Sequence, residues 1–435
     1  MRGVREMHRR LMQAILVAGA LATQVALSGP VSSSSAASDT AAQGEPGDEC
    51  VQGPDPLSGS IEYETISLAS VLANIEANDP VTLPFFQTSY QIQFTKWDDA
   101  VAPGARLSYV DGSGVHDTNL TSILYTGVLV QNASNTVVFG ITESWIQGYV
   151  ADSDRVHVLE MSRDPQAPTP FRSYDIDPAQ YSGCEDSGLG LAPVPPEDAK
   201  AREPDPPILQ QIPPQVVLLY SDVNYFNMFW WCPWIGIPQA RCAANQMQGD
   251  WALANLIFSR DPGVPLPISQ VLVHTPAHNG GLTSLDSQTL LLQLRADAIA
   301  HVTQCVARIC SPNFHAVHLY SGKVLNGNTI GRAWEPGHFS LSQHVPKPWI
   351  AYFADPYHRT VAVVTHETGH SYNGDHDFAW LSNLCMPTGW QGWTVMSEWR
   401  FQPKACAFSF ANAVRIHNNA ETHPLCIVNQ VPCVQ

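Results

Sequence analysis

The stretch Thr365–Phe378, THETGHSYNGDHDF, places three histidines and one glutamate within eleven positions. The residues before it, VAVV at 361–364, are apolar, so the sequence predicts a buried helix over 360–373. Residues four apart share one face of a helix, so His366 and His370 direct two imidazoles at a common point. Zinc sites use this spacing. Glu367 is rotated from His366 by about 100°, which lets it reach a water on the metal without being a ligand.

A third histidine follows six residues after His370. A continuing helix would carry His376 to a different face, so the chain must end the helix and turn back. Asn373 and Gly374 are the residue types that best tolerate the left-handed conformation such a turn needs. The sequence therefore predicts that three neutral imidazoles meet at one Zn²⁺ ion, which keeps a fourth position for water.

Composition limits the class of protein. The chain has 435 residues, which suits two or three domains, and 44% of them are hydrophobic. Charged residues make up only 14%, and the net charge is −17. This acidity argues against nucleic acid and anionic membrane surfaces as partners, because both are negatively charged.

The first residues predict export. Residues 1–10 are basic and are followed by 17 mostly apolar residues, 11–27, so we expect a cleavable signal peptide at 1–29. A membrane anchor is the alternative, but Gln13 and Gln24 interrupt a run that is already short for spanning. The mature chain is thus expected to be secreted, and extracellular rather than in the membrane. Ten cysteines fit an oxidising compartment, where Cys305 and Cys310 favour a disulfide over a metal site.

A proline-rich segment divides the chain. Residues 189–214 contain eight prolines, which block helix and favour an extended linker. Before it, 30–188 is expected to be mainly β, because short runs between 60 and 177 alternate apolar and polar residues. After it, 215–435 is expected to be α/β (α+β) with a mixed sheet. The expected strands are 215–223, 269–275, 315–322 and 328–334, and the expected helices are 243–259, 285–302 and 360–373.

The histidine stretch resembles that of the metzincin zinc proteases, whose pattern is H-E-x-x-H-x-x-G-x-x-H followed by a Met-turn. Asn373 stands where most members have glycine, a departure that some adamalysins share. Asp377, directly after His376, is similar to the adamalysin/reprolysin branch. Thr394–Ser397, TVMS, resembles the Met-turn, with Met396 as its methionine; Met386 fits less well. Residues 407–416 are similar to the segment after that turn.

The resemblance implies a fold and an activity. It implies a metzincin-like catalytic domain over 215–435 and a zinc endopeptidase acting on protein or peptide substrates. Glu367 would be the general base, and Met396 the apolar floor below the zinc ligands. The substrate would pair with an edge strand at 329–334. Ca²⁺ is the second cation found in relatives. Residues 125–161 are similar to an adamalysin propeptide, which implies that the chain's own propeptide, 30–188, is its inhibitor.

Several alternatives stay open. Cys184 could cap the zinc, although a disulfide with Cys50 is favoured. By resemblance, Cys385 would pair with Cys406, and Cys232 would pair locally with Cys242. A thermolysin-like peptidase would take a glutamate as third ligand, with Glu398 the candidate, and a non-enzymatic protein could retain the zinc site. The remaining histidines near the helix are expected to lie on the surface or to be hydrogen-bonded; they are His338, His344 and His358.

Overall fold

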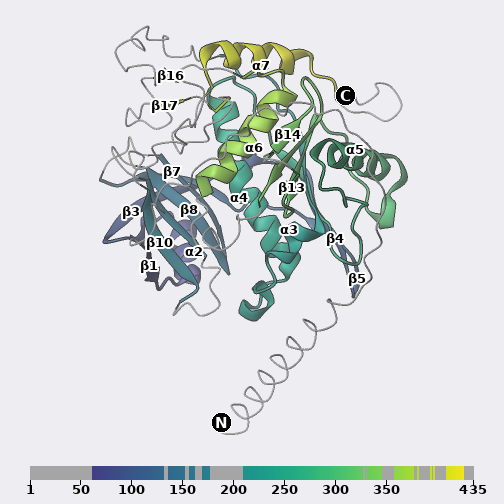
Figure 1. The fold of residues 1–435 in the computed structure, drawn as a ribbon. Coiled ribbons are helices and arrows are strands. Elements are labelled where there is room, and N and C mark those ends of the chain that lie inside the picture. Colours follow the sequence, from purple (N-terminus) through teal and green to yellow (C-terminus); the bar gives the residue numbers. More distant parts are fainter. Residues whose placement is uncertain are drawn as a thin grey trace, which may run out of the picture. The chain divides into compact units, whose positions relative to one another are not determined.

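A computed structural model describes residues 61–131, 136–151, 156–161, 169–176, 209–326, 329, 331–344, 357–376, 380–381, 392–393, 395–396 and 408–425. These residues form two large sheets and the helices packed on them (Figure 1). The predicted signal peptide, most of the linker, and Cys50, Cys184, Cys385 and Cys406 lie outside this part of the chain.

A seven-stranded mixed sheet forms the centre of the region after the linker. Its order is β14 (Gly331–Ala333), β15 (Phe339–Gln343), β13 (Ala316–Ser321), β11 (Val217–Ser221), β12 (Ile268–Val273), β4 (Val101–Asp111) and β5 (Gly114–Asn119). The five inner strands run parallel, and the two outer strands are antiparallel to their neighbours. Every residue of β11, β12 and β13 is buried, as expected for parallel strands covered on both faces.

Helices cover both faces of this sheet. Residues 218 and 220 of β11 join the core under α5 (Ser287–Gln304), while residues 217 and 219 join the core with α4 (Gln239–Arg260). Helix α6 (Tyr357–Ser371) packs against α4 and against β13, β14 and β15. Asp286 caps the N-terminus of α5: its side chain accepts a hydrogen bond from the amide of Thr289. The result is three layers, with α6 beside the edge strand β14.

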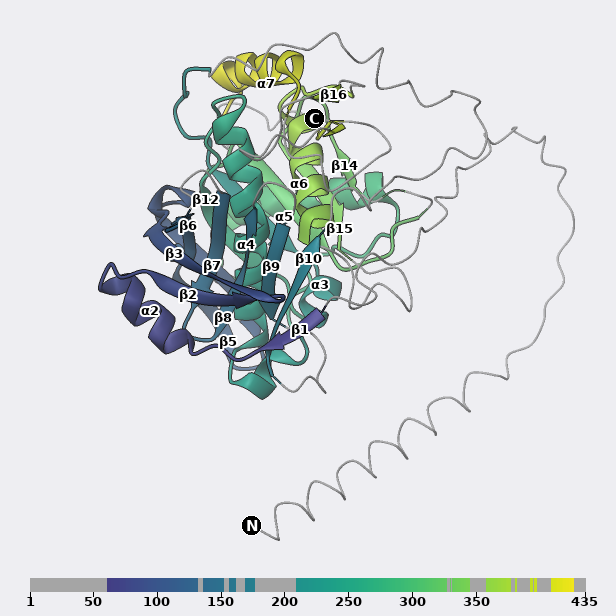
Figure 2. The same cartoon turned by 90° about the vertical axis from the view of Figure 1, so that its left-hand side faces the viewer.

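An eight-stranded antiparallel sheet forms the region before the linker. Its order is β1 (Ile61–Glu64), β10 (Phe171–Ile176), β9 (Val156–Met161), β8 (Trp145–Ala151), β7 (Thr136–Thr142), β6 (Leu124–Leu129), β3 (Thr88–Lys96) and β2 (Val81–Phe85). The sheet curls so that β2 also approaches β1, β9 and β10, and α2 (Leu68–Glu76) packs on it. Helix α4 contacts β6, β7 and β8, so it lies between the two sheets (Figure 2).

The β4–β5 hairpin crosses the division that the proline-rich segment suggests. Strand β4 pairs in parallel with β12, with Leu107 opposite Val271 and Tyr109 opposite Val273. A strand from before the linker therefore extends the sheet formed after it. The general expectation of short strands between 60 and 177 covers β4 and β5, but it carries no information about their partner, because the pairing of β4 with β12 joins segments about 160 residues apart in sequence.

The remaining elements are short. They are α3 (Val223–Asn227), α7 (Phe410–Thr422), β16 (Trp380–Leu381), β17 (Gly392–Trp393) and 3-10 helices at Asp98–Ala100, Cys232–Ile235 and Val306–Arg308. The two cysteine pairs within the described residues, Cys232–Cys242 and Cys305–Cys310, are disulfides, as predicted. Among the described helices, none combines the length and hydropathy that crossing a bilayer requires.

Candidate metal centre

Helix α6 carries the first two histidines of the predicted site. Its apolar residues Val361, Val363 and Val364 are buried. His366 and His370 are also buried, one turn apart on the same helix. The helix is thus held by its apolar residues while two polar rings face the interior, where each ring nitrogen needs a partner.

The chain reverses directly after α6 through a Schellman motif. The amide of Gly374 donates to the carbonyl of Gly369 over 2.8 Å, and the amide of Asn373 donates to the carbonyl of His370 over 2.9 Å. Asn373 takes the left-handed conformation, with φ of 67°. Gly374 is needed for its size rather than its φ, since a Cβ there would lie 2.9 Å from the Gly369 oxygen. This reversal brings His376 back to the helix.

Three ring nitrogens meet at this point. The Nε2 atom of His370 lies 3.0 Å from Nε2 of His366 and 3.1 Å from Nε2 of His376, and the third side of the triangle is 3.3 Å. Nitrogens on one tetrahedral zinc ion, each about 2.0–2.1 Å from it, lie about 3.3 Å apart. The triangle therefore has the dimensions that such an ion requires.

Backbone carbonyls orient two of the rings. Nδ1 of His366 donates to the carbonyl of Val395 over 2.8 Å, and Nδ1 of His370 donates to the carbonyl of Gly374 over 2.7 Å. Each bond fixes the proton on Nδ1 and leaves a lone pair on Nε2. The two Nε2 lone pairs, 3.0 Å apart, repel each other unless a cation lies between them. Hydrogen bonds from Nδ1 to a backbone carbonyl are usual for histidines that bind a metal through Nε2. The residues present fit zinc.

Burial sets the charge of the site. It lowers the pKa of His366 to about 3 and the pKa of His370 to about 4, so both rings are neutral at neutral pH, which is the form that binds a metal. Burial also raises the pKa of Glu367 to about 8, while the positive charge of Arg332 acts in the opposite direction. A divalent cation beside Glu367 would lower this pKa, because it favours the charged carboxylate.

Glu367 lies against the edge strand. A Cβ at Gly331 of β14 would be 2.6 Å from Cγ and 2.7 Å from Cδ of Glu367, closer than any ordinary contact. The Glu367 side chain is buried against β14, and only glycine at position 331 leaves room for it. Gly331 was not singled out from the sequence, because the Gly-Arg dipeptide within the predicted edge strand does not indicate a contact with Glu367.

The predicted floor residue packs beneath the turn. Met396 is fully buried, and its Sδ would lie 2.6 Å from a Cβ at Gly369. Its Cε would lie 3.2 Å from a Cβ at Gly374, so two glycines make room for one methionine. The neighbouring Val395 supplies the carbonyl that orients His366. The segment 395–396 therefore supports the histidine cluster from one side.

Helix α7 holds the return segment from the other side. The Asn412 amide donates to the carbonyl of Asp375 over 2.9 Å, and its oxygen accepts from the Asp375 amide over 2.9 Å. Arg415 pairs with the Asp375 carboxylate at 2.9 Å. Because Asp375 directly precedes His376, this two-point hold on its backbone fixes where the third ring lies. Residues 407–416 are similar to a segment of the reprolysins, but the sequence does not indicate that Asn412 contacts Asp375.

Other predicted residues lie elsewhere or outside the described chain. Nδ1 of His338 donates to the carbonyl of His315, and His344 stacks on Tyr320 and bonds to Ser342, so neither joins the cluster. Asp377, Glu398, Met386 and the side chain of His358 lie outside the described residues. A second group that could hold a metal ion, His274, His278 and Asp297, was not singled out, although both H-x-x-x-H and D-x-x-x-H spacings are visible in the sequence.

Comparison with known proteins gives distant structural likeness alone. The sequence matches no family profile and no curated protein. A crystal structure of metalloproteinase-II from Bacteroides fragilis is similar at 13% identity and a TM-score of 0.44, over 81% of this chain and 94% of that chain.

Proposed function

We propose that this protein is a secreted zinc-dependent endopeptidase that hydrolyses peptide bonds in proteins or peptides. The observation that carries the proposal is the triangle of three ring nitrogens, 3.0, 3.1 and 3.3 Å apart, with a buried glutamate next to it in the chain. Three protein ligands leave a fourth position for water, on which the buried carboxylate would act as general base.

His366, His370 and His376 would hold the ion through their Nε2 atoms. A bound zinc ion supplies a Lewis acid and lowers the pKa of water to about 7. Glu367 takes a proton from the attacking water and passes it to the leaving amine nitrogen. The carbonyls of Val395 and Gly374 keep the two helix rings in the required tautomer.

The edge strand is the proposed place for the substrate backbone. Among the described residues, β14 pairs with β15 alone, which leaves its outer side without a strand partner. An extended peptide can add to such an edge through main-chain hydrogen bonds. Because Gly331 of β14 contacts Glu367, a peptide bound along this strand would pass close to the proposed base.

The test compares two glutamate variants of the full chain. Glu367→Gln keeps the shape of the side chain but cannot accept a proton, so we expect casein cleavage to fall by about 10²–10⁴-fold. Zinc content should remain unchanged, since Glu367 is not a ligand. Glu421→Gln, on the exposed side of α7, is the matched control and should retain full activity. Equal activity of both variants would overturn the proposal.

His376→Ala separates the proposal from a thermolysin-like site. If His376 is the third ligand, this variant loses the zinc of this site, as measured by atomic mass spectrometry of dialysed protein. If a downstream glutamate is the third ligand, the zinc remains. We also propose residues 1–29 as signal peptide and 30–188 as an inhibitory propeptide. Because β4 is paired with β12, a cut at Lys200 or Arg202 in the linker is not expected to release the part before it, so the test also digests that part. A rise in activity would support the inhibitory role, and unchanged activity of the remaining folded part would contradict it.

A further inference from the structure

A second group of potential metal ligands lies on elements other than those of the first. His274 directly follows β12, His278 lies four residues further in the loop, and Asp297 is on α5. Each offers one ligand atom, and these atoms all lie within 4.8 Å of one another. His274 and Asp297 are buried, and His278 is half-buried. Three donors from a strand end, a loop and a helix thus converge on one point.

Hydrogen bonds elsewhere on the rings leave their inner nitrogens available. Nδ1 of His274 donates to the carbonyl of Ser221 over 2.8 Å, and Nδ1 of His301 donates to the carbonyl of Asp297 over 2.9 Å. Within the described chain, Nε2 of His274, His278 and His301 and Oδ2 of Asp297 are buried without a hydrogen-bond partner. Buried polar atoms rarely stay unsatisfied, so the three that belong to His274, His278 and Asp297 call for a ligand.

The nearest contact between these atoms is not a hydrogen bond. His274 Nε2 lies 3.0 Å from Asp297 Oδ2, but the direction of the ring does not suit an N–H bond to that oxygen. A nitrogen and an oxygen bound to one tetrahedral ion at about 2.0–2.2 Å are about 3.4 Å apart, so a small outward shift of the two side chains would admit the ion. His301 Nδ1 lies 3.4 Å from the same carboxylate oxygen, but it donates to the backbone carbonyl of Asp297 and makes no hydrogen bond to that oxygen.

The loop is shaped around this cluster. Gly280 has φ of 60°, and a Cβ there would lie 2.6 Å from Cδ2 of His274 and 2.9 Å from Oδ1 of Asp297. Only glycine lets the backbone come this close to the donors. A cavity of about 290 Å³, lined in part by Pro276 and Asn279, lies against the same loop.

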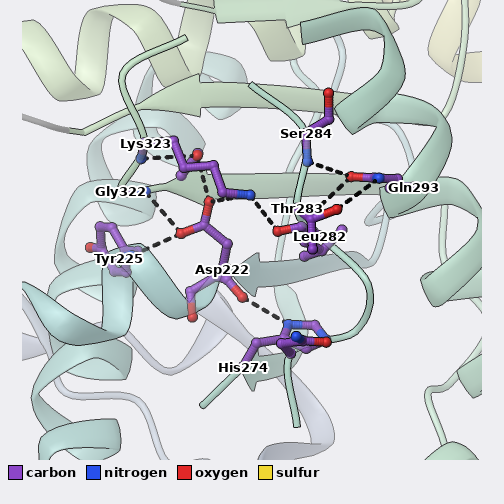
Figure 3. A network of polar contacts seen from close by, with 12 residues as sticks. Asp222, Tyr225, His274, Leu282, Thr283, Ser284, Gln293, Gly322 and Lys323 are labelled. Carbon is purple, nitrogen blue, oxygen red and sulfur yellow. Dashed lines mark hydrogen bonds and ion pairs between the residues drawn. The ribbon is translucent and has the colours of Figure 1, made fainter. Parts of the chain in front are cut away.

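A separate polar network anchors the same region (Figure 3). Asp222 accepts hydrogen bonds from the amides of Tyr225 and Gly322, and Lys323 lies 3.7 Å from its carboxylate. Lys323 also donates to the carbonyl of Leu282, which fixes the far end of the loop. The positive charge of Lys323 is thus paired with Asp222 and does not oppose a cation at His274.

The donor chemistry selects the kind of ion. Imidazole nitrogens with one carboxylate suit zinc and similar transition metals, whereas calcium and magnesium prefer oxygen ligands alone. We propose that His274, His278 and Asp297 form a second zinc site, with a fourth position left for water. The ion would join the carboxyl ends of β11 and β12 to α5 through the loop 274–281. A proton shared between Asp297 and a neighbouring ring is the competing explanation.

The experiment counts zinc in the full chain after dialysis against metal-free buffer. We expect about two zinc ions per chain in the wild type, one in His366→Ala/His370→Ala, and one in His278→Ala. Combining all three substitutions should remove both. Asn279→Ala, in the same loop but not a ligand, is the matched control and should keep two. His278 is only half-buried, so its replacement is tolerated better than that of His274.

Two further measurements keep the test decisive. Asp297→Asn preserves side-chain shape, and it should also lose one zinc ion while circular dichroism shows a folded chain. Cobalt added to His366→Ala/His370→Ala should give the strong visible absorption of a four-coordinate ion, absent when His278→Ala is added. One zinc per wild-type chain and none in His366→Ala/His370→Ala would overturn the proposal, as would a second zinc that survives both His278→Ala and Asp297→Asn. One zinc that is lost only with His278→Ala would instead uphold it and contradict the proposed catalytic site.

Discussion

Replacing Gly331 by alanine puts a methyl group where the Glu367 side chain now lies. The new Cβ would be 2.6 Å from Cγ of Glu367, against an ordinary carbon contact of about 3.5–4.0 Å, so one of the two must move by about 1 Å. Overpacking of this kind costs about 1–3 kcal/mol. A displacement of about 1 Å at a catalytic group can cost about 10²-fold in rate. We therefore expect Gly331→Ala to lower kcat/KM about 100-fold while zinc stays bound.

The assay is cleavage of a fluorogenic peptide, measured in a double-mutant cycle with Glu367→Gln. If Gly331 acts through Glu367, adding Gly331→Ala to Glu367→Gln has little further effect, because the proposed base is already lost. Gly112→Ala is the control, since a Cβ there meets nothing within 4 Å. Wild-type activity in Gly331→Ala, or losses that simply multiply in the double variant, would refute the contact as the reason for the glycine.

Three further predictions rest on other contacts. Asn412→Ala removes both hydrogen bonds to the backbone of Asp375 and should weaken zinc binding about 10–100-fold in chelator competition. Arg415→Ala, which removes an exposed ion pair with the same residue, is the control and should change zinc binding little. Burial lowers the pKa of His318 to about 3, below the unfolded value of 6.5. As the pH falls, the unfolded chain therefore takes up a proton on this ring before the folded chain does. The contribution of the neutral, buried His318 ring to stability is complete above about pH 6.5 and falls by about 1.4 kcal/mol per pH unit as the pH drops toward 3. His318→Asn should therefore flatten a plot of urea midpoint against pH over this range. An unchanged slope would contradict this prediction. Cutting the linker within 189–208 should leave the two parts of the chain together on a sizing column, because β4 is paired with β12 and the core is shared; separation without denaturant would contradict this.

The local features of the fold were predictable from the sequence. The apolar run and the Asn-Gly pair after α6 predict a helix followed by a reversal, because helix ends depend on the chemistry of a few adjacent residues. The structure has Asn373 in the left-handed conformation, while Gly374 serves by being small. That division of roles depends on Met396, which is more than twenty residues away, and so it could not be predicted locally.

The non-local features were not predictable. Strand β15 has serines at 340 and 342, which are buried because His318 bonds to both over 2.8 Å. Without this partner the segment looks too polar for an inner strand. The second histidine group shows the same limit, since Asp297 joins His274 and His278 only after α5 packs on the sheet. Side chains from separate elements meet through tertiary packing, which spacing along the chain does not contain.

Anomalous diffraction at the zinc edge from crystals of the full chain is the most direct test of the proposed metal centre. We expect a peak about 2.0–2.1 Å from the Nε2 atoms of His366, His370 and His376. No peak at this position, or a zinc ion bound there with another residue in place of His376, would contradict the three-histidine site.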